Sequence, residues 1–201
     1  MDGVIAEEDS SWITIHKYFG VDNSKSFKDY LDGKIDYSEF MRRDISLWPK
    51  MNIKTIENIF QNTKIIEGAK QVVTECKKKG YITALVSAGL DVLANKINKE
   101  LEFDYVFANG LTIDQNGNLL GTGICRVELL RKDKVLTNLS KQLEIPLSQF
   151  VAIGDSKYDI AMLEIVGLSI AFNPKDEEIK RVVDIIIENN DINKILNYLL
   201  N

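Results

Sequence analysis

FVAIGDSKYD, residues 150–159, is a short apolar run that ends in a glycine and two carboxylates. Apolar runs of this length, bounded by turn residues, are typical of strands buried on both faces of a parallel sheet. Asp155 would leave the end of this strand, and Asp159 would lie on the first turn of the next helix. Because ligands of open parallel sheets bind outside the carboxyl ends of the strands, we expect a site here.

The sequence around this stretch alternates between buried strands and amphipathic helices. Further strands are expected at residues 81–86, 105–107, 168–172 and 182–187, and a hairpin at 111–125 with its turn at Asn116-Gly117. A closing helix is expected over 192–200, capped by Asp191. This order predicts a parallel sheet with crossover helices.

Residues 10–62 follow a different pattern, which is helical throughout. The expected helices are short, and they stop at Gly20, Gly33 and Pro49. The sequence therefore predicts an α/β fold in which a doubly wound (Rossmann-like) parallel sheet carries a small inserted helical cap. The predicted core comprises residues 1–9 and 66–201, and the cap comprises residues 10–65.

Composition narrows the classes of function. The chain has 201 residues, is 45% apolar and 27% charged, and carries a net charge of -5, which argues against disorder and against nucleic acid as the main ligand. The apolar runs are far shorter than the roughly 20 residues of a membrane helix, and no basic, apolar leader is present. Cys76 and Cys125 lack a CxxC pattern, and His16 is the single histidine, so a reducing cytoplasm is expected and neither a disulfide framework nor structural zinc is.

The two carboxylates of residues 150–159 have two interpretations. Asp155 and Asp159 are four residues apart, so both could converge on one hard cation, and oxygen ligands of this kind suit Mg²⁺. Alternatively, Asp155 caps the following helix and Asp159 favours its positive end. The motif alone does not decide between these readings.

Two further segments carry groups that suit a phosphate. Ser87, Ala88 and Gly89 follow a buried strand and offer a hydroxyl and successive N–H groups, although this motif alone favours Ser87 as only a helix cap. Lys132 opens an expected helix, where a cation opposes the helix dipole and calls for an anionic partner. A solvated lysine is the alternative for Lys132.

The order of these motifs resembles the haloacid dehalogenase superfamily of phosphohydrolases, and within it the phosphoserine phosphatase group. The resemblance rests on Asp2-Gly3-Val4, the helical insert, the strand that ends at Ser87, Lys132, and the carboxylate pair. Residues 103–109 and 170–175 support it, and it covers essentially the whole chain.

The resemblance implies a role for each motif residue. Ser87 would hydrogen-bond a phosphoryl oxygen, with Ala88 and Gly89 beside it, and Lys132 would neutralise phosphoryl charge. Asp155 would ligate Mg²⁺, and Asp159 would hold the lysine or a metal-bound water. Asp2 would protonate the leaving oxygen, later deprotonate the attacking water, and lend its backbone carbonyl to the metal.

The chain departs from the family pattern at its start. In the family motif Asp-x-Asp-Gly the first Asp attacks phosphorus, and Met1 occupies the x position here. The strand that should carry this nucleophile, in the middle of the sheet, is also missing from the printed sequence. We expect about 6 to 10 further residues ahead of Met1, mostly β-branched or Leu and ending in Asp. The rival expectation is true loss of the nucleophile.

Substrate residues in the cap also differ. The family's glutamate for the substrate amine and arginine for its carboxylate fall on Asp9 and Asp44. Asp44 would repel a carboxylate unless Arg42 or Arg43 replaces the family arginine. Weak or no preference for phosphoserine over other small phosphomonoesters is therefore expected.

The leading hypothesis is a Mg²⁺-dependent phosphatase of a small phosphorylated metabolite that forms an aspartyl-phosphate, acts as a monomer or homodimer, and binds neither nucleic acid nor membrane. One alternative is a non-catalytic pseudophosphatase that binds a phosphoester or a partner protein. A weaker alternative is a phosphotransferase or mutase.

Overall fold

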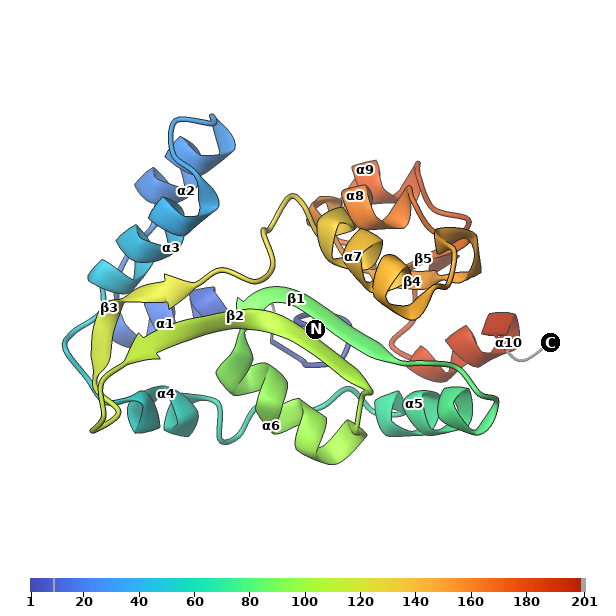
Figure 1. Cartoon of the computed structure of the whole chain (residues 1–201), viewed down its shortest axis with the longest axis horizontal. Coiled ribbons are helices and arrows are strands. Elements are labelled where there is room, and N and C mark those ends of the chain that lie inside the picture. The colour runs from blue at the N-terminus through green and yellow to red at the C-terminus, as the bar shows by residue number, and fades with distance from the viewer. Residues whose placement is uncertain (9, 200–201) are drawn as a thin grey trace.

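The computed structural model describes residues 1–8 and 10–199, and its strands form two three-stranded sheets (Figure 1). The first sheet contains β1 (Ala84–Leu90), β2 (Tyr105–Ile113) and β3 (Leu119–Ile124). The second contains β4 (Val151–Gly154), β5 (Leu168–Phe172) and β6 (Ile185–Ile187). β1 pairs with β2, β4 with β5, and β5 with β6, all in parallel, whereas β3 is antiparallel to β2. The expected α/β class with parallel strands is confirmed.

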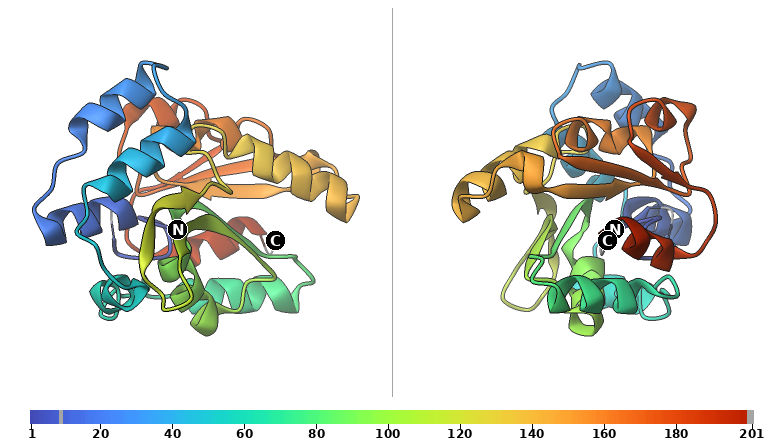
Figure 2. Two further views of the ribbon diagram at one scale, coloured as in Figure 1. Left: turned by 60° about the vertical axis from the view of Figure 1, so that its left-hand side comes forward. Right: turned by 90° about the vertical axis from the view of Figure 1, so that its right-hand side faces the viewer.

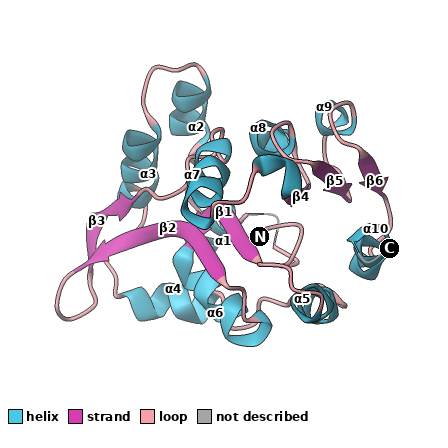
Figure 3. Ribbon diagram, turned by 45° about the vertical axis from the view of Figure 1, so that its right-hand side comes forward, coloured by secondary structure: helices cyan, strands magenta, loops and turns pink. Residues whose placement is uncertain are grey.

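Helices cover both faces of these sheets (Figure 3). The helices of the core are α5 (Ala69–Lys78), α6 (Asp91–Leu101), α7 (Asp133–Leu143), α8 (Ile160–Leu163), α9 (Glu177–Lys180) and α10 (Leu196–Leu199), with 3-10 turns at Leu147–Gln149, Lys157–Asp159 and Ile192–Ile195. In α7 the apolar residues Val135, Leu136 and Leu139 fall on one buried face, as the three- and four-residue spacing requires. None of the described helices is long and apolar enough to cross a membrane.

Four helices precede the core helices: α1 (Ser11–Phe19), α2 (Ser24–Leu31), α3 (Tyr37–Ser46) and α4 (Ile53–Ile59). α2 and α3 lie together on one side of the first sheet and α4 lies on the other, beside α6 (Figures 1 and 2). α1 contacts both β1 and α4, and α3 packs on β3. The segment therefore wraps around the edge of the first sheet, and α2 and α3 project over the carboxyl end of β1.

An apolar slot separates the two sheets. β1 and β4 are the facing edge strands, and in the described part of the chain neither has a strand partner on that side. A cavity of about 430 Å³ lies between them, lined by Leu85 and Val86 of β1, by Ala152 and Ile153 of β4, and by apolar residues of α5 and α7. The slot has the composition of an interior that holds a strand buried on both faces.

Several elements differ in extent from the sequence prediction. β1 begins at Ala84 rather than at residue 81, because its ladder starts only where Tyr105 of β2 comes opposite. β2 is one long strand because its first half pairs with β1 and its second half with β3.

Two elements of the C-terminal part also differ in extent from the sequence prediction. β6 starts at Ile185, because the carboxylate of Asp184 accepts hydrogen bonds from the N–H and hydroxyl of Ser169 and ends the preceding turn. The expected closing helix is a 3-10 turn followed by α10, capped by Asp191 as predicted, and Leu200 lies outside the described residues.

Candidate active site

A second cavity, of about 410 Å³, lies between the carboxyl ends of β1 and β4 and the helices that project over them. Its core side includes Asp2, Ser87, Ala88, Gly89, Lys132, Asp155, Asp159 and Lys175. Its cap side includes Trp12, Asn23, Phe27, Tyr37, Phe40 and Asp44. The expected core-side residues thus come together on one wall, although they are distant in the sequence.

Lys132 and Asp159 form a largely buried ion pair in this wall. Lys132 stands immediately before α7, and its Nζ lies 2.5 Å from Asp159 Oδ1, with the two side chains 12% and 5% exposed. Asp159 Oδ2 accepts from the backbone N–H groups of Asp155 and Ser156. Burial acts to raise the pKa of Asp159, but the charge and hydrogen bond of Lys132 hold that pKa below its usual value. Lys134, in contrast, pairs with Glu128 and is half exposed.

Asp155 lies against the turn that contains Asp2. Its Oδ2 is 2.8 Å from Lys175 Nζ, and burial, followed by the charge of Asp159, raises the pKa of the Asp155 carboxyl. Gly3 has a φ of +72°, and a Cβ at Gly3 would overlap Asp155 Oδ2. Glycine is needed here both for the backbone conformation and for the close approach of the carboxylate.

Asp2 presents a carboxylate oxygen without a partner. Its Oδ2 accepts from Ser11 Oγ at 3.3 Å, whereas its Oδ1 is buried and makes no hydrogen bond. Burial raises the pKa of Asp2, against the effects of neighbouring positive charge and of Ser11. Buried oxygens are nearly always satisfied, so this oxygen suits a bound cation or proton donor.

The residues present suit a Mg²⁺ site in which protein atoms supply only some of the ligands. No three His, Cys, Asp or Glu side chains among residues 1–8 and 10–199 are grouped to hold a metal by themselves. Mg²⁺ usually takes one or two carboxylates and completes its octahedron with water and substrate phosphate. Asp155 supplies such a carboxylate and Asp2 could add its backbone carbonyl, whereas both oxygens of Asp159 are engaged by Lys132 and backbone N–H groups.

The segment of Ser87, Ala88 and Gly89 differs from its expected place at a helix start. β1 continues through it, and α6 begins only at Asp91. The extended backbone is held because Leu90 N–H donates to Ser11 Oγ of α1. Ser87 Oγ accepts from Gly89 N–H at 3.0 Å.

The carbonyl oxygen of Ala88 joins the cap to this segment. It accepts from Trp12 Nε1 at 3.0 Å, from Tyr37 Oη at 3.1 Å and from Asn109 Nδ2 at 2.9 Å. Sequence reasoning assigned no role to Tyr37 or to Asn109. For Asn109 the sequence offered two signals, a polar residue within an apolar run and a place in residues 103–109, which support the family resemblance. The structure buries Asn109 fully in β2.

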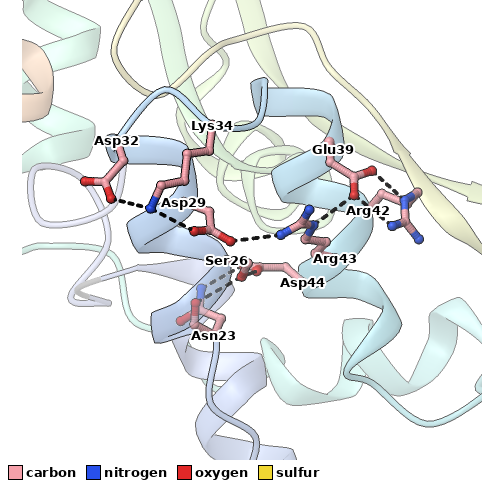
Figure 4. Close-up of polar contacts among 9 residues, drawn as sticks. All are labelled: Asn23, Ser26, Asp29, Asp32, Lys34, Glu39, Arg42, Arg43 and Asp44. Carbon is pink, nitrogen blue, oxygen red and sulfur yellow. Dashed lines mark hydrogen bonds and ion pairs between the residues drawn. The ribbon is translucent and has the colours of Figure 1, made fainter.

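The cap residues expected to contact substrate are separated from one another. Arg42 pairs with Glu39, and Arg43 pairs with Glu39 and Asp29, and neither arginine lines the cavity (Figure 4). Asp44, the next residue, does line the cavity. Asp9 lies outside the described residues.

The chain is similar to known proteins over most of its length. Residues 128–199 match the family of haloacid dehalogenase-like hydrolases. The chain is 36% identical over 178 residues to a phosphoserine phosphatase of Methanocaldococcus jannaschii, covering 87% of this chain and 82% of that protein. It is 33% identical over 166 residues to a phosphoserine phosphatase of Archaeoglobus fulgidus, covering 82% of this chain and 48% of that protein.

Solved structures are similar over nearly the whole chain. A phosphoserine phosphatase with a phospho-aspartyl intermediate analogue aligns with a TM-score of 0.82 at 32% identity, over 98% of this chain and 95% of that chain. A substrate-bound phosphoserine phosphatase aligns with the same TM-score and identity, over 98% and 94%.

Proposed function

Because the chain belongs to the haloacid dehalogenase superfamily, as a phosphoric monoester hydrolase of its phosphoserine phosphatase-like group, we propose that it hydrolyses a small phosphomonoester with Mg²⁺ through an aspartyl-phosphate. The observation that carries the proposal is the convergence of Ser87, Lys132, Asp155 and Asp2 on one cavity. Phosphoryl transfer depends mainly on positioned donors, cations and an in-line nucleophile, and this wall supplies the first two.

Ser87 and Lys132 would bind the phosphoryl group. Ser87 Oγ accepts from Gly89 N–H, which leaves its own O–H to donate to a phosphoryl oxygen. Lys132 is held by Asp159 at the edge of the cavity, where its charge would offset that of the phosphoryl oxygens. Asp159 thus acts through Lys132 as a positioning residue.

Asp155 would hold Mg²⁺ through its carboxylate, and Asp2 would hold it through its backbone carbonyl. When bound, Mg²⁺ would neutralise charge on the phosphoryl oxygens and orient them for in-line attack. Lys175 pairs with Asp155 and would have to share that carboxylate with the cation.

Asp2 is proposed as the general acid and base. Its carboxyl is buried beside Gly89 and hydrogen-bonded by Ser11, so it stands at the boundary between the phosphoryl wall and the cap. It would donate a proton to the leaving alcohol and later take one from the attacking water.

The nucleophile is proposed to be an aspartate just upstream of Met1, carried by a strand in the slot between β1 and β4. The apolar lining of the slot and the two facing strand edges support this placement. The nitrogen of Met1 is buried among the charges of Asp2, Lys132, Asp159 and Asp155, so a residue attached to it would enter the same cavity.

The substrate is proposed to be a small phosphorylated metabolite in the cytoplasm, bound by a monomer or homodimer without nucleic acid or membrane. Residues 10–65 would act as the cap that excludes bulk water, over a core of residues 1–9 and 66–201. The cavity includes side chains of α1, α2 and α3, and its volume of about 410 Å³ supports a substrate of this size.

A phosphate-release assay on the natural full-length protein tests the proposal. A generic aryl phosphate should be hydrolysed with Mg²⁺ and not after chelation, and replacement of the upstream Asp by Asn should abolish turnover. Binding of phosphate esters without turnover would overturn hydrolysis in favour of a pseudophosphatase. A stable phosphoprotein with little released phosphate would instead indicate a phosphotransferase.

A further inference from the structure

The cap end of the active-site cavity carries a buried anion that the proposed reaction does not use. Asp44 of α3 is 1% exposed and lines the cavity. Its Oδ2 accepts from His16 Nε2 at 3.0 Å and from Asn23 Nδ2 at 2.7 Å, and its Oδ1 accepts from Ser26 Oγ at 2.7 Å. Burying a charged carboxylate is costly unless it is well hydrogen-bonded, as this one is.

In the described part of the chain, no lysine or arginine pairs with this carboxylate, and its partner His16 is a neutral donor. Trp48 Nε1 donates to His16 Nδ1 at 2.8 Å, and an indole nitrogen can only donate, so Nδ1 must be the unprotonated nitrogen. His16 is therefore neutral and donates to Asp44 through its Nε2–H. Figure 4 shows the nearby guanidinium of Arg43 directed to Asp29 and Glu39 instead.

Both lysines that line the cavity belong to its phosphoryl end. Lys132 pairs with Asp159, and Lys175 pairs with Asp155. Among the described residues of α1 to α3 that line the cavity, Asp44 is the one with a formal charge. The lysines among the described lining residues thus lie at the end where a phosphoryl group would bind, where they offset the carboxylates there. The end where the leaving group would lie has Asp44 and, among the described lining residues, no lysine or arginine.

Aromatic rings complete the cap end. Phe27 lies with its ring centroid 5.8 Å from that of Phe40 and 6.2 Å from that of Tyr158, and all three rings line the cavity together with Trp12. Aromatic faces attract ammonium groups and offer nothing to a carboxylate.

From this arrangement, which rests on the proposed phosphatase function, we infer that the site selects a phosphomonoester of a small amino alcohol whose leaving group carries an ammonium group and no carboxylate. The ammonium would lie between Asp44 and the aromatic rings. A carboxylate on the same leaving group would face the Asp44 charge, and the two like charges would repel each other.

Three esters of similar size test the inference on the natural full-length protein with Mg²⁺. Phosphoethanolamine and O-phosphoserine differ by the carboxylate, and n-propyl phosphate replaces the ammonium of phosphoethanolamine with a methyl group. We expect kcat/KM to be roughly tenfold or more higher for phosphoethanolamine than for O-phosphoserine, with n-propyl phosphate between them. Equal or better use of O-phosphoserine overturns the inference.

Asp44→Asn keeps the shape and removes the charge. It should bring kcat/KM for phosphoethanolamine and O-phosphoserine to within about threefold of each other while changing n-propyl phosphate little. A purely structural role of Asp44 would lower all three values together and leave their ratios unchanged, which also overturns the inference. Asp29→Asn removes a cap carboxylate that does not line the cavity, and it should leave every ratio unchanged.

Binding measurements separate this inference from the proposed function. If no ester is hydrolysed, the phosphatase proposal fails, and calorimetric Kd values of the same three esters still decide the selectivity. The order phosphoethanolamine, n-propyl phosphate, O-phosphoserine supports it, and any order in which O-phosphoserine binds as tightly as phosphoethanolamine overturns it.

Discussion

Lys132 Nζ donates to Asp159 Oδ1 at 2.5 Å, across 27 residues of chain. The lysine stands at the start of α7, where the helix dipole disfavours a cation, and the carboxylate stands in the turn after β4. Asp159 compensates this unfavourable position and directs the ammonium group toward the cavity. A surface ion pair would not need a lysine at an unfavourable helix start that a distant carboxylate holds in place.

Lys132→Ala should lower kcat/KM far more than Lys134→Ala does. Removing one preorganised charge-stabilising group typically costs roughly 10²- to 10³-fold, whereas Lys134 contacts only Glu128 at the surface. Steady-state hydrolysis of a generic phosphate ester by the full-length protein measures the effect. Similar small losses in both variants would contradict the placement of Lys132 in the site.

Removal of Mg²⁺ with a chelator should abolish hydrolysis, and added Mg²⁺ should restore it. Asp155→Asn should raise the Mg²⁺ concentration needed for half-maximal rate by roughly tenfold or more, because one of few carboxylate ligands is lost. The control is Glu57→Gln, an exposed position of α4 remote from the cavity. An unchanged Mg²⁺ requirement in Asp155→Asn would show that Asp155 is not a ligand.

Gly3→Ala should inactivate the protein, whereas Gly33→Ala should only destabilise it. Both glycines have positive φ, +72° and +69°, so alanine carries a similar backbone cost of about 1 to 2 kcal/mol at each. A Cβ at Gly33 meets nothing within 4 Å, but at Gly3 it would displace the Asp155 carboxylate. Thermal melting and kcat/KM, measured on both variants, separate backbone strain from displacement of the Asp155 carboxylate. Equal losses of activity in the two variants would contradict the proposed role of Gly3 beside Asp155.

Filling the slot between β1 and β4 should stabilise the chain. An extension ahead of Met1 of about 6 to 10 residues, mostly Val, Ile or Leu and ending in Asp, should pair both strand edges and raise Tm by at least about 2 to 4 °C. It should also confer ester hydrolysis. The same extension ending in Asn is the matched control, expected to keep the gain in Tm without turnover; an extension that leaves Tm unchanged would contradict the proposed strand.

The sequence was most informative where a signal is local. β5 spans Leu168–Phe172 as expected, since five apolar-rich residues between turns specify a buried strand without outside help. β1 was displaced by three residues at its start and extended through Ser87, because its limits depend on Tyr105 and Ser11, which are distant in sequence.

The same distinction applies to the site. Asp155, Asp159 and Lys132 could be proposed because each has a recognisable position at a strand end or helix start. Tyr37 and Asn109 could not, because their role is defined by one carbonyl oxygen that they reach from different elements. The rotation of α3 about its axis decides which of its side chains reach the cavity, and periodicity alone does not give that rotation. It directs Arg42 and Arg43 to partners within the cap and Asp44 to the cavity.

The Ala88 carbonyl has a thermodynamic consequence. A peptide oxygen has two lone pairs, and here three donors share it, two of them from α1 and α3. The peptide unit that this oxygen belongs to also contains the N–H of Gly89, next to Ser87. Any movement of α1 and α3 relative to β1 would therefore act on the backbone beside Ser87. A phosphoryl group bound to Ser87, as proposed, would in turn act on the position of α1 and α3. If closure of α1 and α3 over the cavity raises the affinity for a phosphoryl anion by some factor, binding of that anion must raise the equilibrium constant for closure by the same factor.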